Sequence, residues 1–149
     1  MAVKPIPEGY HSVTPYLTVQ GAAKLLDFLQ QAFDAKVTER MERPDGVIGH
    51  AEVRIGDSVV MLAEASSQWK PMPGAIYLYV NDTDATYKRA VQAGATSVME
   101  PANQFYGDRN GGVKDPTGNL WWIATHVENV SPEEMKRRAE AYMKKQGHA

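Results

Sequence analysis

The sequence contains no cysteine among its 149 residues. Disulfides, zinc ribbons, cysteine nucleophiles and thiolate-held iron–sulfur clusters are therefore excluded together. The chain also has little net charge, because 16 basic side chains nearly balance 18 acidic ones and leave a formal charge of −2. Nucleic acids and anionic membrane surfaces attract strongly basic domains, so neither is an expected partner.

Long hydrophobic runs are missing as well. Nowhere do the roughly 18 consecutive apolar residues of a membrane-spanning helix occur, and residues 1–7 lack the apolar centre of a signal peptide. We therefore expect a cytoplasmic protein that does not enter a membrane. What the chain does have is 43% apolar and 23% charged residues, a balance typical of one soluble globular domain with a substantial core.

The first half of the chain, about residues 10–65, predicts one module of β-α-β-β-β order. Alternating β-forming residues predict a strand over 12–19, and apolar residues at spacings of three and four predict an amphipathic helix over 22–33. Three further strands are expected over 37–42, 48–55 and 58–63, separated by turns at 43–46 and 56–57.

The second half, about residues 75–128, repeats this order after a proline-containing linker over 66–74. We expect a strand over 75–80, a helix over 83–93, a strand over 97–100, a loop over 101–112 and a last strand from residue 119. Five residues recur at a constant distance of 61 positions. The pairs are Tyr16 and Tyr77, Leu17 and Leu78, Val19 and Val80, Ala32 and Ala93, and Val37 and Val98. An internal duplication and an α+β fold follow.

A final helix is expected over about 132–145. Ser131 is a good N-cap, Pro132 suits the first helical position, and Glu134 completes the pattern of a capping box. The apolar residues Met135, Ala139, Tyr142 and Met143 form one stripe on it. That stripe either docks on its own domain, which ordinary helix behaviour favours, or acts as a dimer contact or a lid.

The last strand begins after the turn-forming sequence Asp115-Pro116-Thr117-Gly118 and carries adjacent tryptophans. Because side chains alternate along a strand, Trp121 and Trp122 must point to opposite faces. Trp121 belongs to the uniformly apolar set that we expect beneath the two helices. The opposite face collects aromatic and polar side chains, as a small-molecule pocket does. They include Thr14, Tyr16, His50, Glu52, Arg54, Met61, Tyr77, Tyr79, Trp122 and His126.

Five short stretches in order, residues 14–17, 49–57, 106–109, 115–118 and 122–128, resemble the vicinal oxygen chelate superfamily. That superfamily includes glyoxalase I, bleomycin-resistance proteins and extradiol dioxygenases, and the likeness is closest to its PhnB-like branch. The resemblance implies a single domain over 1–149, in which two β-α-β-β-β modules curl mixed sheets around a cavity. It also implies a homodimer.

The resemblance further implies where a metal would be held. The four ligand positions of the metal-using members fall here on Thr14, Met61, Ala75 and Trp122. None of these side chains is an imidazole or carboxylate donor of the kind that Zn²⁺, Ni²⁺ or Fe²⁺ needs. We therefore expect no cofactor and no metal at these positions.

Three other groups of residues could carry chemistry. His50 and Glu52 lie two residues apart on one strand face, so they could act as an acid/base pair or simply form a structural hydrogen bond. Arg109 could clamp an anionic ligand or form an ion pair near its own loop. His126 and Glu128 repeat the spacing of His50 and Glu52, and for them a structural role is favoured.

These observations leave two functions open. The first is a metal-free binding protein that sequesters a small aromatic or amphipathic molecule against Thr14, Tyr16, Arg54, Met61, Tyr77, Tyr79, Arg109, Trp122 and His126. The second is an enzyme of lyase, isomerase or dioxygenase type whose site is displaced to His50 and Glu52. The sequence does not identify the ligand.

Overall fold

A computed structural model describes residues 2–147 and contains eight strands and three helices in this part of the chain. The first module contains β1 (Tyr16–Val19), α1 (Ala22–Phe33), β2 (Lys36–Glu42), β3 (Ile48–Ile55) and β4 (Ser58–Glu64). The second contains β5 (Ala75–Tyr79), α2 (Thr83–Gln92), β6 (Thr96–Asn103), β7 (Asp108–Lys114) and β8 (Leu120–His126). The last element is α3 (Pro132–Lys145), so the predicted α+β architecture is confirmed.

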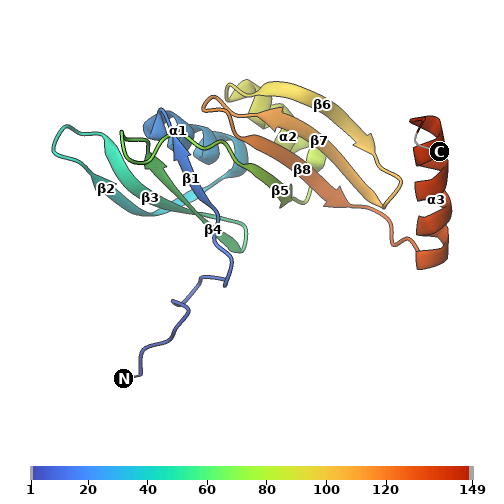
Figure 1. The fold of residues 1–149 in the computed structure, drawn as a ribbon, viewed down its shortest axis with the longest axis horizontal. Coiled ribbons are helices and arrows are strands. Elements are labelled where there is room, and N and C mark those ends of the chain that lie inside the picture. Colours follow the sequence, from blue (N-terminus) through green and yellow to red (C-terminus); the bar gives the residue numbers. More distant parts are fainter. Residues whose placement is uncertain (1, 148–149) are drawn as a thin grey trace.

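Each module forms its own four-stranded mixed sheet. The strand orders are β1-β4-β3-β2 and β5-β8-β7-β6, and in each the first pair is parallel and the other two pairs are antiparallel. The two sheets lie side by side, with α1 and α2 on the same side of the molecule (Figure 1). We call the opposite side of each sheet its open face. The registers support the duplication, because Tyr16 pairs with Met61 in the first sheet and Tyr77 with Trp122 in the second.

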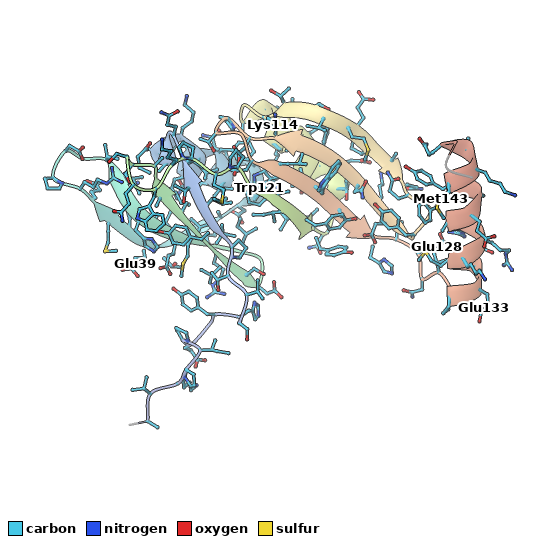
Figure 2. All side chains as sticks on the ribbon, viewed as in Figure 1. Glu39, Lys114, Trp121, Glu128, Glu133 and Met143 are labelled. Carbon is cyan, nitrogen blue, oxygen red and sulfur yellow. The ribbon has the colours of Figure 1, made fainter. Side chains whose placement is uncertain are left out.

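One hydrophobic core joins the two modules. Its largest members come from α1, β4 and β8, and Trp121 is completely buried. Its ring lies 4.9 Å from that of Phe33 at the end of α1, where the two modules meet (Figure 2). The alternation predicted for the two tryptophans is confirmed, since Trp122 is only half-buried on the other face.

Buried polar contacts fix the turn before β8. The Asp115 carboxylate accepts hydrogen bonds from the Thr117 amide and hydroxyl, each at 2.8 Å, and from the Asn119 side chain at 3.0 Å. It also accepts from the Trp121 indole N–H at 2.8 Å. Asn119 in turn accepts from the Gly74 amide at 2.9 Å, which attaches the end of the linker to this turn.

The predicted N-cap of the last helix is present, but its capping box is not complete. Asp82 and Ser131 accept from the amides of Ala85 and Glu134 and so cap α2 and α3. The Glu134 carboxylate binds Arg137 and Arg138 in place of the reciprocal capping-box contact. α1 has no side chain of its own at the cap, and its first amides, those of Gly21 and Ala22, donate to the Glu64 carboxylate of β4.

Two predictions about the elements were wrong. The first strand starts at Tyr16 and not at residue 12, because the preceding segment bends where the Thr14 hydroxyl donates to the His11 carbonyl. Most of the predicted loop over 101–112 is occupied by the end of β6 and by β7. Gly111 and Gly112 have low strand propensity and concealed β7 from sequence reasoning. Both are packed closely, and a Cβ on Gly112 would lie 2.6 Å from the Trp122 ring.

Replacing Asp115 with alanine should lower the free energy of unfolding by about 3 kcal/mol, because the buried indole and amide donors lose their acceptor. Urea unfolding of the variant measures the loss. Asp27, exposed on α1, provides the matched control, and Asp27→Ala should leave stability nearly unchanged. Equal losses in the two variants would contradict the role assigned to Asp115.

Candidate functional site

A cavity of about 400 Å³ opens on the open face of the second sheet. Its volume is in the range of small-molecule pockets. Strands β5, β7 and β8 form its floor, the segment after β6 forms one wall, and α3 contributes one side chain. The lining residues are Tyr77, Met99, Gln104, Phe105, Tyr106, Asn110, Trp122 and Tyr142.

A buried carboxylate organises the polar groups beside this cavity. Asp108 at the start of β7 is almost fully buried. It accepts hydrogen bonds from the hydroxyls of Tyr77 at 2.7 Å and Tyr79 at 2.8 Å, and from His126 Nδ1 at 2.8 Å. The other ring nitrogen of His126 lies 2.9 Å from Asn129 Oδ1. Three strands are thus joined through one side chain.

These contacts shift the pKa values of the groups involved. Burial alone would raise the pKa of Asp108, but hydrogen bonds from His126, Tyr77 and Tyr79 outweigh it and lower that pKa. The same contact with Asp108, followed by the contact with Asn129, raises the pKa of His126. Burial, with the bond to Asp108, raises the pKa of Tyr77, while the bond from Asn110 opposes this shift. The carboxylate is therefore ionised and both phenols are protonated near neutral pH.

Asn110 lines the cavity, and its side-chain oxygen is buried and unpaired in the described part of the chain. Its side chain is 2% exposed, and its amide nitrogen donates to Tyr77 at 2.9 Å and to Tyr106 at 2.8 Å. Tyr77 uses its own proton on Asp108, so its oxygen must accept, and this fixes the orientation of the amide. Within residues 2–147 the Asn110 Oδ1 is buried without a hydrogen-bond partner. Leaving such an acceptor unpaired costs about 1–3 kcal/mol.

Helix α3 covers one end of the cavity through few contacts. The Tyr142 ring lies 5.0 Å from that of Phe105, and Arg138 forms two bonds of 2.8 Å to Glu128 and one of 3.1 Å to the Phe105 carbonyl. Glu128 lies in the segment between β8 and α3 (Figure 2). The described helix has no buried residue, so the predicted docking on its own domain is only partial.

The first sheet holds a second group of polar side chains. His50 Nε2 lies 2.7 Å from Glu52 Oε2, and the hydroxyl of Tyr10 also donates to Glu52. Since the carboxylate can only accept, His50 donates through Nε2, and its Nδ1 accepts from Tyr16 at 3.3 Å. The bond from Tyr10, then that from His50, lowers the pKa of Glu52. The predicted pairing of His50 and Glu52 is therefore present.

The segment before β1 contacts this part of the first sheet through Tyr10, and its start extends away from the sheet (Figure 1). It encloses about 380 Å³ together with Thr14, Glu52 and Met61, while Arg54 donates to the Gly9 carbonyl at 3.2 Å. The predicted site residues are thus divided between two sheets. The cavity beside Tyr77 and Trp122 and the hollow beside Thr14 and Met61 each take their strand residues from a single sheet.

The prediction that Arg109 binds an anionic ligand is wrong. Arg109 points to the helix side of β7, where it binds Asp84 of α2 at 3.1 Å and Asn103 at 3.2 Å. The reason is strand alternation, because Asp108 and Asn110 take the open face and leave Arg109 on the other. The ion-pair alternative is therefore the correct one, and the clamp for an anionic ligand is not formed there.

Sequence reasoning missed Asp108 beside the cavity and most of the lining residues, namely Met99, Gln104, Phe105, Tyr106, Asn110 and Tyr142. Assigning 101–112 to a loop removed the alternation that would have placed Asp108 and Asn110 with Tyr77. The signal was present in the two-residue spacing of Asp108, Asn110 and Gly112. Nothing local in the sequence predicts that Tyr142 reaches Phe105, since 37 positions separate them.

The four positions that the sequence resemblance assigned to a metal carry no suitable donor set here. The registers place Met61 and Trp122 at equivalent points opposite Tyr16 and Tyr77. A hydroxyl, a thioether, a methyl group and an indole at Thr14, Met61, Ala75 and Trp122 are not a donor set for Zn²⁺, Ni²⁺ or Fe²⁺. Across residues 2–147, no three His, Asp or Glu side chains converge as a possible metal site.

No helix in this range is long and apolar enough to cross a membrane.

Comparison with known proteins agrees with the fold and with the sequence resemblance. The family model of the Glyoxalase/Bleomycin resistance protein/Dioxygenase superfamily matches residues 9–123, and the chain belongs to this superfamily. An uncharacterized protein of Mycobacterium bovis is 38% identical over 136 residues, covering 84% of this chain and 90% of its own length.

Two solved structures show the same fold. TioX from Micromonospora sp. ML1 has a TM-score of 0.67 at 24% identity, covering 78% of this chain and 99% of its own. A glyoxalase/bleomycin resistance protein/dioxygenase family enzyme from Burkholderia phytofirmans PsJN has a TM-score of 0.65 at 18% identity, covering 76% and 97%.

The contact between His126 and Asp108 predicts a pH dependence. A raised pKa in the folded state means that the contribution of His126 to stability is complete below its unfolded pKa of about 6.5 and disappears as pH rises through the folded value. NMR titration should place the His126 pKa above that of a free imidazole, and Asp108→Asn should lower it. The stability difference between the native protein and His126→Gln should be larger at low than at high pH.

Asp27→Asn is the control and should leave the His126 titration unchanged. A His126 pKa that is the same in the native protein and in Asp108→Asn would contradict the contact.

Proposed function

We propose that the protein binds a small aromatic or amphipathic molecule in the cavity of the second sheet and sequesters it without a metal. The observation that carries this proposal is a cavity of small-molecule size whose walls are mainly aromatic. A flat ligand between Trp122 and Phe105 gains stacking and apolar burial.

The protonation states beside the cavity support reversible binding. Asp108 is already saturated by Tyr77, Tyr79 and His126, so it is not free to act as a general base. The hydrogen bonds to Asp108 therefore serve to position side chains. They hold Tyr77 in one orientation, and Tyr77 in turn orients Asn110. Membership of a superfamily that includes bleomycin-resistance proteins agrees with this function. The finer placement in the PhnB-like branch stays a prediction.

A second candidate function rests on the contact between His50 and Glu52. Glu52 orients the imidazole and Tyr16 donates to its other nitrogen, an arrangement suited to proton transfer at the Tyr16 oxygen. Tyr10 also occupies the Glu52 carboxylate. An enzyme with its site displaced to the first sheet would use these groups, and it would depend on His50.

The two functions respond differently to substitution. A thermal-shift screen of metabolites and antibiotics supplies a ligand, since binding stabilises the folded state. Trp122→Ala should weaken binding of that ligand with a small loss of stability, because a cavity already borders its ring. Trp121→Ala should lower the free energy of unfolding by about 3–5 kcal/mol through a hole in the close-packed core. Calorimetric titration and denaturant unfolding measure the two effects.

His50→Gln is the control that separates the candidates and should leave binding intact. Loss of binding in His50→Gln with none in Trp122→Ala, or a turnover rate abolished by His50→Gln, would favour the displaced enzyme site. A larger loss of stability in Trp122→Ala than in Trp121→Ala would invert the assignment of the two faces.

We also propose that two chains pair. Both open faces leave large aromatic side chains in solvent, including Tyr16 at 53% and Tyr79 at 60% exposure, and β1 and β5 are edge strands of their sheets. Setting the first module of one chain against the second module of another would cover both faces. Sedimentation at micromolar concentration should give a dimer. A monomer under these conditions would contradict the proposal.

A further inference from the structure

A third hollow lies beside the first sheet, where the linker passes β1. Its volume is about 590 Å³, larger than the cavity of the second sheet. The side chains that matter for its chemistry are Tyr16, Thr18, Arg43, Glu64, Trp69 and Met72. Three of these come from the β2–β3 turn and the linker, which the proposed function does not use.

The linker side of this hollow is held in place. The Ser66 amide donates to the Trp69 carbonyl at 2.8 Å, and the Trp69 amide donates back to the Ser66 hydroxyl at 3.0 Å. Three residues further on, the Met72 amide donates to the Thr18 carbonyl of β1 at 3.0 Å. The backbone is fixed at both points, yet the Trp69 side chain is 67% exposed and Met72 is 74% exposed. Two large apolar groups are thus presented to the hollow without being packed.

Arg43 supplies a positive charge on the opposite wall. Its side chain crosses Gly49, whose added Cβ would lie 3.2 Å from Arg43 Cγ. Its Nη2 donates to the Glu64 carbonyl at 2.9 Å, which leaves the other guanidinium N–H donors without a partner among residues 2–147. No carboxylate in this range lies within 4.0 Å of Arg43.

The nearby Glu64 carboxylate does not neutralise this charge. It accepts from the Gly21 amide at 3.0 Å and the Ala22 amide at 2.9 Å, so it is committed to the positive N-terminus of α1. The hollow therefore combines an unpaired guanidinium with open aromatic surface. The charged group beside the cavity of the second sheet is instead negative, since it is the Asp108 carboxylate.

We propose that this hollow is a second binding site, specific for a small aromatic carboxylate. The carboxylate binds the free N–H groups of Arg43, and the ring packs against Trp69 and Tyr16 with Met72 at its edge. A planar guanidinium held across a glycine recognises a planar carboxylate through two parallel hydrogen bonds, and a volume of this size accepts a two-ring molecule.

The test compares 2-naphthoate with 2-naphthamide, which share a shape and differ in charge. Calorimetric titration of the full chain should show tighter binding of 2-naphthoate by about tenfold, the ratio expected for one charge-assisted contact. Arg43→Gln should abolish this preference, and Trp69→Ala should weaken binding of both molecules. The control is Arg40→Gln, in β2 close to Arg43 but bound to Glu42, which should leave the preference intact.

Three results would overturn the proposal. The first is a preference for 2-naphthoate that survives Arg43→Gln, and the second is binding lost in Trp122→Ala but not in Trp69→Ala. The third is no saturable binding of 2-naphthoate by a chain whose circular dichroism spectrum is native. If Trp69→Ala instead changes the sedimentation coefficient and leaves naphthoate binding unaltered, the surface is a subunit contact and the small-molecule assignment is wrong.

Discussion

The contact between the Asp115 carboxylate and the Trp121 indole is the constraint on which the second module depends. A buried carboxylate needs donors on every side, and the turn supplies them from Thr117, Asn119 and Trp121. This arrangement fixes where β8 begins. Because side chains alternate along the strand, fixing Trp121 in the core also fixes Trp122 on the open face. The wall of the cavity is thus determined by a turn that lies outside it.

The duplication provides two similar frames that carry different chemistry. Glu52 pairs with Met61 in the first sheet, and Gly112 pairs with Trp122 in the second. A carboxylate beside a flexible thioether leaves room for the contacts to His50 and Tyr10. A glycine beneath an indole lets the Trp122 ring lie against the strand, which a Cβ at that point would prevent. One backbone arrangement therefore gives a hydrogen-bonded acid and imidazole in one module and an aromatic wall in the other.

The arrangement of the modules explains why both open faces remain largely exposed to solvent in a single chain. Within the chain, the modules meet through α1, α2 and the core around Trp121, so the two open faces do not cover each other. The segment before β1 and the helix α3 each cover part of one face through a few polar contacts. Aromatic side chains that remain exposed on a fixed frame are suited to an added partner, whether a ligand or a second chain.

Much of this protein was determined by local sequence. The periodicity of residues 22–33, the capping pattern around Ser131 and the turn at 115–118 gave the correct elements, because each depends on near neighbours along the chain. The alternation of Trp121 and Trp122 also separated core from cavity. The repeat at a distance of 61 positions predicted the duplicated fold, since both halves follow the same rules of packing.

Only the tertiary structure shows how the open faces of the two sheets are arranged and which polar groups come together. Strand β7 was not predicted because Gly111 and Gly112 have low strand propensity. Both glycines allow close packing, Gly111 against Tyr87 and Gly112 against Trp122, and such contacts cannot be read from local sequence. The joining of Asp108 to Tyr77, Tyr79 and His126 depends on β5 lying beside the β7–β8 pair, although β5 is separated from that pair by α2 and β6 in the chain. The unpaired Asn110 oxygen and the free charge of Arg43 are likewise results of packing, because a hydrogen bond that is missing can be recognised only after every possible partner has been placed.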